Sequence, residues 1–292
     1  MSTRTKLVLV WLGLAALGAS GCADQKPRYR PQFPPKTASA SMPRPSGRVL
    51  FVLSAAQQQI LQNGKRRPTG NFLSELYEPY AALKKAGYEV VAATPTGRAP
   101  SVDPESLADK YWGDHLEQRE SARALLKSPP FVRPLPLRDA LAAQHEFQGM
   151  LVPGGQGLMV DLLHDADVHA LVARFAASDR PLGMVCHAPA LLTRLASPSR
   201  LRGRQVTSVS GFEEFYIETF VMQGEAQVRN IGDQLEAAGY AHATAFAGRS
   251  HAVRDCNLVT SQNPFSGSAF TQLYLAALDD FRRGARCVAA QP

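Results

Sequence analysis

The sequence predicts an α/β protein whose mostly parallel, doubly wound sheet carries helices on both faces. Short apolar runs, the pattern of strands buried on both faces, alternate along the chain with segments of helical periodicity. Such alternation is typical of parallel strands connected by helices. Of the 292 residues, 45% are hydrophobic, which is enough for one large core.

Each strand is expected where an apolar run is bounded by turn residues, and each helix where apolar residues recur every three or four positions. In chain order, the expected strands begin at Arg48, Tyr88, Phe147, Pro181 and Gln205, with two short ones near Ala243 and Asn257. The expected helices cover 72–83, 168–177, 212–221, 228–238 and 265–283. A polar segment between Pro100 and Pro136 is expected to be a helical insertion into the same domain.

The first 22 residues have the pattern of a secretory leader. Arg4 and Lys6 precede an apolar run over 7–17, which is too short to span a bilayer unaided. The small residues that follow, with Cys22, resemble the lipobox of bacterial lipoproteins, in which the cysteine is lipidated. Ordinary signal-peptidase cleavage is the alternative, because Ala19 stands where leucine is commoner in that motif.

Residues 23–47 are expected to be a proline-rich tether between the leader, 1–22, and a domain over 48–292. The leader carries a formal charge of +2 and the tether +4, so only +1 of the total +7 belongs to the domain. A nearly neutral domain argues against nucleic acid as a partner. The lipobox resemblance implies export and a lipid anchor on the periplasmic face of a membrane, with Ala23 compatible with the outer membrane.

Four cysteines leave an odd number of thiols if Cys22 is lipidated. We expect Cys186 to be free in the folded protein. Cys256 and Cys287 are expected to be two separate buried thiols, and they would pair only if their Cα atoms came within reach. Neither of these two is assigned a role.

The segment GMVCHAPALL predicts a nucleophile elbow at Cys186, because an apolar strand runs into the cysteine and a helix is expected directly after it. Ala188 is the small residue that a sharp turn needs, and Pro189 suits the first turn of a helix. Backbone dipoles at a helix N-terminus are expected to lower the pKa of the sulfur. A buried structural cysteine is the competing interpretation.

Four motifs together resemble the ThiJ/PfpI superfamily, and best its chaperone and glyoxalase III branch. They are PTGNFLSE, LVPGGQG, GMVCHAPALL and NLVTSQNPFSGSAF, in the family's order. The resemblance spans Arg48 to about Ala277. It implies a flavodoxin-like fold of the glutamine amidotransferase type, cysteine chemistry that needs no cofactor, and a homodimer as an assembly that this branch often forms.

The resemblance also implies roles for residues around Cys186. Glu75 corresponds to the acid beside the sulfur, and His187 to a group that assists proton transfer, which suits the pKa of histidine. The turn at Gly154 and Gly155 corresponds to an oxyanion site, together with the N–H of His187. An ordinary tight turn fits the spacing of the two glycines equally well.

Glu75 is unusual in the residue pattern as well. If Asn71 caps the helix, Ser74 takes the capping-box position, and Glu75 falls between the apolar positions Phe72 and Leu76. A protonated carboxyl beside a sulfur would explain an acid in that place. A solvent-facing glutamate is the alternative.

A third partner for His187 is implied within SGFEEFYIE, where Glu214 is favoured. The neighbouring Glu213 and Glu218 are expected to belong to a surface acidic cluster. The sequence also departs from the family, which often has histidine at the position of Gln156 and glycine at that of Ala188. These departures put the positioning of the substrate in doubt.

No metal site is expected. His115 and Glu120 are five residues apart and would not share one helix face, and no HxxxH or CxxC pair is present. Some relatives bind zinc in this region.

The resemblance implies glutathione-independent, glyoxalase III-like conversion of methylglyoxal, or a related 2-oxoaldehyde, to a 2-hydroxy acid through a hemithioacetal on Cys186. A holdase chaperone with a redox-sensing cysteine is a second hypothesis, and a weak cysteine peptidase or amidase is a third. Glutaminase activity is disfavoured, because His242 and His251 lack the glutamate that follows the histidine in amidotransferases.

Overall fold

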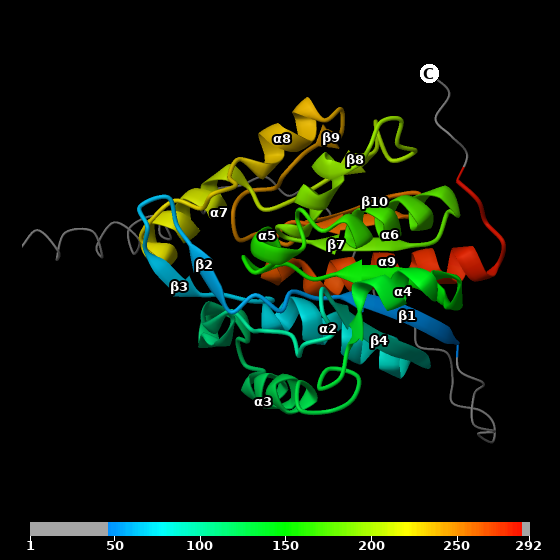
Figure 1. The fold of residues 1–292 in the computed structure, drawn as a ribbon, viewed down its shortest axis with the longest axis horizontal. Coiled ribbons are helices and arrows are strands. Elements are labelled where there is room, and N and C mark those ends of the chain that lie inside the picture. Colours follow the sequence, from blue (N-terminus) through cyan, green and yellow to red (C-terminus); the bar gives the residue numbers. More distant parts are fainter. Residues whose placement is uncertain (1–45, 288–292) are drawn as a thin grey trace, which may run out of the picture. The chain divides into compact units, whose positions relative to one another are not determined.

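The computed structural model describes residues 46–287, which form an α/β unit around a seven-stranded sheet (Figure 1). The strand order is β10-β11-β7-β6-β1-β4-β5, and all neighbours are parallel except β10 and β11. The predicted fold class is therefore confirmed. The predicted leader, lipidated Cys22 and most of the tether lie outside the described residues.

The central strands are apolar on both faces, as a sheet covered by helices requires. The strands of the main sheet are β1 (Gly47–Val52), β4 (Tyr88–Thr94), β5 (Leu135–Pro136), β6 (Phe147–Val152), β7 (Leu182–Val185), β10 (Ala252–Asp255) and β11 (Leu258–Ser261). Two small sheets add β2 (Gln58–Ile60) with β3 (Arg66–Pro68), and β8 (Gln205–Val206) with β9 (Ala241–His242).

The structure has the helices expected from the sequence and two short additional ones. They are α2 (Leu73–Lys85), α3 (Leu116–Leu125), α4 (Leu137–Ala142), α5 (Leu158–Asp161), α6 (Ala166–Ala177), α7 (Gly211–Tyr216), α8 (Ile231–Ala237) and α9 (Gly267–Arg282). The shorter 3₁₀ turns are η1 (Pro104–Leu107), η2 (Asp109–Tyr111), η3 (Gln144–Glu146), η4 (Ala188–Arg194) and η6 (Pro264–Ser266), and η5 (Ile217–Met222) is a π-helix. The insertion expected between Pro100 and Pro136 contains η1, η2 and α3.

Two glycines let α9 pack closely on the sheet. A Cβ at Gly149 would lie 2.7 Å from the Tyr274 hydroxyl, and one at Gly183 would lie 2.8 Å from the Phe270 ring. Real Cβ atoms do not approach other atoms so closely, so only glycine permits this helix–sheet distance. Helices α2 and α9 pack against each other, and α4 packs against α6.

Some local expectations were wrong. The strand expected at QVTSVS has only two residues, in β8. The chain then leaves the strand, because the Thr207 N–H donates to the Thr260 hydroxyl and the Val209 N–H donates to the carbonyl of Cys186. The β2–β3 hairpin, α4, α5 and the antiparallel β10 were not expected. The hairpin was missed because its strands are largely polar.

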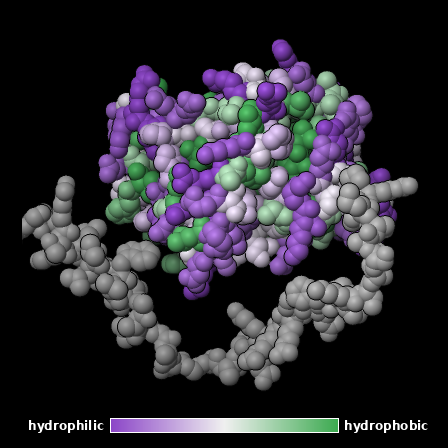
Figure 2. All heavy atoms as spheres, turned by 90° about the horizontal axis from the view of Figure 1, so that it is seen from below, coloured by the Kyte–Doolittle hydropathy of each residue, from purple (hydrophilic) through white to green (hydrophobic). Residues whose placement is uncertain are grey.

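Hydrophobic residues are dispersed among hydrophilic ones on the face shown in Figure 2. No helix within residues 46–287 has both the length and the apolar character needed to cross a bilayer.

Candidate active site

Cys186 occupies a strained turn at the end of β7. Its φ of +58° is left-handed, which costs a non-glycine residue on the order of 1 kcal/mol. The turn is held from both sides, since Cys186 N–H donates to the Ser261 carbonyl (2.8 Å) and the Cys186 carbonyl accepts from Val209 N–H (3.0 Å). The chain then enters η4, a 3₁₀ rather than an α-helix. The predicted strand–turn–helix arrangement is present in this tighter form.

Glu75 lies in the first turn of α2 and is 2% exposed. Its Oε2 accepts the Gly154 N–H at 3.0 Å, and a Cβ at Gly154 would lie 2.5 Å from this oxygen and 2.6 Å from the Cys186 Cβ, so the carboxyl lies beside Cys186. Burial raises the pKa of Glu75 to about 8, so the carboxyl is mostly protonated at neutral pH. The solvent-facing alternative is therefore wrong, and the structure places this acid beside the sulfur.

The expected Asn71 cap of α2 is also wrong. Phe72 is the N-cap, and no side chain caps the helix. Instead, the side-chain oxygen of Asn71 accepts the Ser54 N–H, and its side-chain nitrogen donates to the Ser54 carbonyl. The same nitrogen donates to the Ser101 carbonyl at 2.7 Å. These bonds hold the loop that precedes Glu75 against β1.

His187 contacts the sulfur with Nδ1 at 3.1 Å, while its Nε2 lies 2.9 Å from the Gln156 amide nitrogen. The Gln156 amide is oriented by Gln59, whose Nε2 donates to Gln156 Oε1 at 3.1 Å. In this network Gln156 donates to Nε2, so the imidazole proton is assigned to Nδ1 and faces the sulfur. Burial lowers the pKa of His187 to about 4, which keeps the ring neutral.

The predicted third partner, Glu214, does not contact His187. It is buried and accepts a hydrogen bond from Ile231 N–H at 3.4 Å, and burial raises its pKa to about 7. The ring of His187 has Gln156 as its partner instead. Sequence reasoning noticed Gln156 only as a departure from the family, because a contact with residue 59 in another element leaves no local signal.

Glu213 and Glu218 do not form a surface acidic cluster. Glu218 is 6% exposed and bound by Arg229 at 2.7 Å. Glu213 completes a capping box with Ser210, and its Oε1 also accepts from Gly248 N–H and from the Asn263 amide. Both carboxylates therefore turn inward and connect loops.

The pKa of the Cys186 thiol is raised, contrary to the helix-dipole expectation. Burial is the largest cause, and the carboxylates of Glu75 and Glu213 add to it, while the N–H of His187 acts in the opposite direction. The short η4 therefore does not outweigh desolvation. Because Glu75 and Cys186 are in contact, they titrate as a pair, and a proton on Glu75 removes its repulsion of a thiolate.

The two glycines of the predicted oxyanion site differ. The Gly154 N–H is already taken by Glu75, and a Cβ at this residue would lie 2.6 Å from the Cβ of Cys186. Within residues 46–287 no acceptor binds the N–H of Gly155, whose φ is +104°. Gly154 thus orients the acid, whereas no group among the described residues uses the N–H of Gly155.

Metal-ligating residue types do not cluster within residues 46–287. In that part of the chain, no three His, Cys, Asp or Glu side chains converge as a metal site would require. His115 pairs with Glu117 at 3.7 Å, whereas Glu120 lies beside Arg119 and Arg123.

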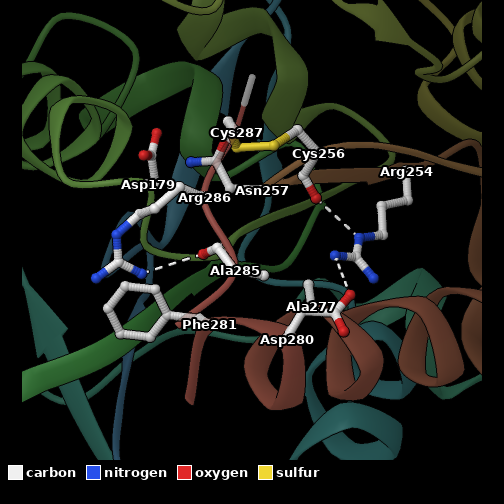
Figure 3. Close-up of a pocket in the computed structure, with 10 residues that line it drawn as sticks. All are labelled: Asp179, Arg254, Cys256, Asn257, Ala277, Asp280, Phe281, Ala285, Arg286 and Cys287. Atoms are coloured by element: carbon white, nitrogen blue, oxygen red, sulfur yellow. Dashed lines mark hydrogen bonds and ion pairs between the residues drawn. A yellow bond between two sulfur atoms is a disulfide. The ribbon is translucent and has the colours of Figure 1, made fainter. Parts of the chain in front are cut away.

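Cys256 and Cys287 form a disulfide, so the expectation of two separate thiols was wrong. Their Cα atoms are 5.6 Å apart, within the usual range for a disulfide. The bond closes one side of a pocket of about 90 Å³ where Arg254 joins the Cys256 carbonyl to Asp280 of α9 (Figure 3). Cys186 is the free cysteine of the described chain, as expected, and does not line this pocket.

The chain is similar to known proteins of one family. Residues 72–277 match the sequence model of the DJ-1/PfpI family. A protein/nucleic acid deglycase HchA of Pseudomonas aeruginosa is 31% identical over 153 residues, which cover 51% of each chain, so this chain spans about half the length of that relative. The glutathione-independent glyoxalase hsp3101 of Schizosaccharomyces pombe is 25% identical, over 81% of this chain and 98% of its own.

The solved structures agree on the fold. A glyoxalase III crystal structure from Candida albicans superimposes with a TM-score of 0.66 over 80% of this chain and 98% of its own, at 20% identity. At this identity the structural similarity shows the fold alone.

Proposed function

The chain belongs to the DJ-1/PfpI family, and we propose that it converts methylglyoxal or related 2-oxoaldehydes to 2-hydroxy acids without glutathione. One observation carries the proposal: a buried cysteine sulfur lies beside a protonated carboxyl, Glu75, and contacts a neutral imidazole, His187. Two proton-transfer groups on one nucleophile match a reaction made of successive proton shifts.

In the first step the Cys186 sulfur adds to the aldehyde carbon. A C–S bond forms, the C=O double bond becomes a single bond, and the thiol proton is transferred to the new oxygen by way of the Glu75 carboxyl. The product is a hemithioacetal. The N–H groups of Gly155 and His187 are suited to stabilise negative charge on that oxygen.

The next steps move two protons. The C1 hydrogen leaves as a proton while the C2 carbonyl oxygen gains one, which gives an enediol, and the reverse pattern at C2 and the C1 hydroxyl gives a thioester. Water then attacks the thioester, the C–S bond breaks and the sulfur recovers its proton. The sum is addition of one water to the 2-oxoaldehyde, with no oxidant, reductant or cofactor consumed.

We also propose that the protein is exported and anchored by lipid on Cys22. The leader and lipobox pattern support this, as does the Cys256–Cys287 disulfide, because such bonds persist in oxidising compartments and are rare in the cytosol. Metabolic labelling with a fatty acid, compared between wild type and Cys22→Ala, tests the anchor. An unlabelled wild type would show that the leader is processed in another way.

Methylglyoxal consumption and lactate formation without glutathione test the reaction. We expect turnover by the wild type, loss of turnover by Cys186→Ser and by Glu75→Gln, and retained turnover by Phe281→Ala, a control beside the disulfide. An inactive wild type with a folded domain and a reduced Cys186 thiol would refute the proposal. It would favour redox sensing or chaperone activity instead.

A further inference from the structure

The segment formed by α7 and η5, residues 211–222, has an inverted polarity. Its acids Glu214 and Glu218 are buried, whereas Phe212, Phe215 and Phe220 are 61%, 54% and 51% exposed. A surface helix normally turns charged residues outward and apolar ones inward. Adjacent exposed aromatic residues are typical of a binding surface, because a folded protein gains nothing by leaving such rings in water.

These rings continue toward the active site as one aromatic strip. The strip comprises Phe72, Tyr111, Phe265, Tyr216, Phe220, Phe215 and Phe212. Ring centroids are 4.8 Å apart for Phe72–Tyr111, 5.8 Å for Tyr111–Phe265 and 5.3 Å for Tyr216–Phe220. Lys110 joins the two halves, with its ammonium 4.8 Å from the Tyr111 ring and 5.7 Å from the Tyr216 ring.

The inner end of the aromatic strip lies against the catalytic turn. Phe72 N–H donates to the Gly154 carbonyl at 3.0 Å, and Gly154 is packed directly on Cys186. The charge near this end is balanced, because Glu105 pairs with Lys110 at 2.6 Å and accepts the Tyr111 hydroxyl at 3.0 Å. The surface that leads away from the sulfur is therefore aromatic and close to neutral.

We propose that the aromatic strip binds the tail of the substrate, so that the preferred 2-oxoaldehydes carry an aromatic or long apolar substituent. This proposal rests on the proposed function. A phenyl group or a longer chain on the aldehyde offers these rings more apolar surface to stack on than a methyl group does. Phe265 and Tyr216 are then specificity-determining residues for a reaction that Cys186 carries out.

Steady-state kinetics with phenylglyoxal and methylglyoxal test the preference. We expect Phe265→Ala and Tyr216→Ala to raise the KM for phenylglyoxal about tenfold, the effect of losing about one aromatic contact in a binding pocket. The constants for methylglyoxal should stay within about twofold. Phe281→Ala is the matched control and should change neither substrate. A wild type without a preference for phenylglyoxal, or equal losses for both aldehydes, would overturn the proposal.

Alkylation of Cys186 provides a readout that needs no turnover. Iodoacetamide and its N-benzyl derivative both form an S–C bond with loss of iodide and of the thiol proton, and mass spectrometry follows both reactions. Relative to N-acetylcysteine, the wild type should favour the benzyl reagent, and Phe265→Ala should lose most of that preference. A benzyl preference without aldehyde turnover would refute the proposed function alone. Turnover without any benzyl preference would refute the role of the aromatic strip alone.

Discussion

Cys186 and Cys256 have the same left-handed backbone angle, φ +58°, but the sulfur of Cys186 is free and that of Cys256 is in a disulfide. Cys256 lies in the two-residue loop between β10 and β11, where a hairpin favours a positive φ, and it is bonded to Cys287. Cys186 ends β7 without a sulfur partner and contacts Glu75 and His187 instead. An unusual backbone angle therefore does not distinguish the two cysteines, whereas the groups around each sulfur do.

The largest expected effect separates the two cysteines by activity. Cys186→Ser should lower kcat/KM by at least about 10³-fold, because serine lacks the nucleophilicity of the sulfur at this site. The paired variant Cys256→Ala/Cys287→Ala should keep kcat/KM within about threefold at 25 °C, since the disulfide lies outside the site. Comparable activity losses in the two variants would remove the distinction between a chemical and a structural cysteine.

Glu75 is expected to lower stability in exchange for activity. Glu75→Gln should reduce kcat/KM by about 10²- to 10⁴-fold, the usual contribution of a proton-transfer group. The wild-type rate should rise with pH up to about 8, as the Glu75–Cys186 pair loses a proton, and should show no inflection near 6.5 because His187 is already neutral. A rate that is independent of pH between 6 and 9 would contradict this assignment.

The same substitution should raise stability in a pH-dependent way. Burial raises the folded-state pKa of Glu75 from its ordinary value of 4.5 to about 8, so the contribution of Glu75 to stability is fully present below about pH 4.5 and is lost as the pH rises to about 8. Glutamine does not ionise, so Glu75→Gln should gain on the order of a few kcal/mol at pH 8 and little at pH 4.5. Urea unfolding at the two pH values measures this difference.

Sequence reasoning succeeded where the signal was local and failed where it depended on distant contacts. The apolar runs that became β1, β6 and β7 and the elbow at Cys186 can be recognised within about ten residues of sequence. The disulfide joins residues 31 apart, and the inward turn of Glu213 depends on partners in the loops at 248 and 263. Such pairings produce no periodic pattern in the sequence, because they join residues that become neighbours only in the folded structure.

Removing the disulfide should affect stability alone. A loop of 31 residues corresponds to about 4 kcal/mol of unfolded-state entropy, so Cys256→Ala/Cys287→Ala should lower the free energy of unfolding, measured in urea, by that amount. Dithiothreitol should have the same effect on the wild type and none on the double variant. Thiol titration of the unreduced, unfolded wild type should detect Cys186 but neither of these two cysteines. An equal urea midpoint for the wild type and the double variant would show that the bond adds no stability.

The smallest expected effect concerns the orientation of the His187 ring. Gln156→Glu replaces the amide donor at Nε2 by a carboxylate, which favours a proton on that nitrogen and should raise the pKa of His187 from about 4 by at least about one unit. Gln58→Glu is the matched control, because Gln58 is exposed and lies next to Gln59 without contacting the ring. Nitrogen-15 NMR of His187 should show the proton on Nδ1 in the wild type and in the control. A proton on Nε2 in the wild type would reverse the assigned direction of the hydrogen bonds, and the ring would then accept the thiol proton of Cys186 instead of donating to the sulfur.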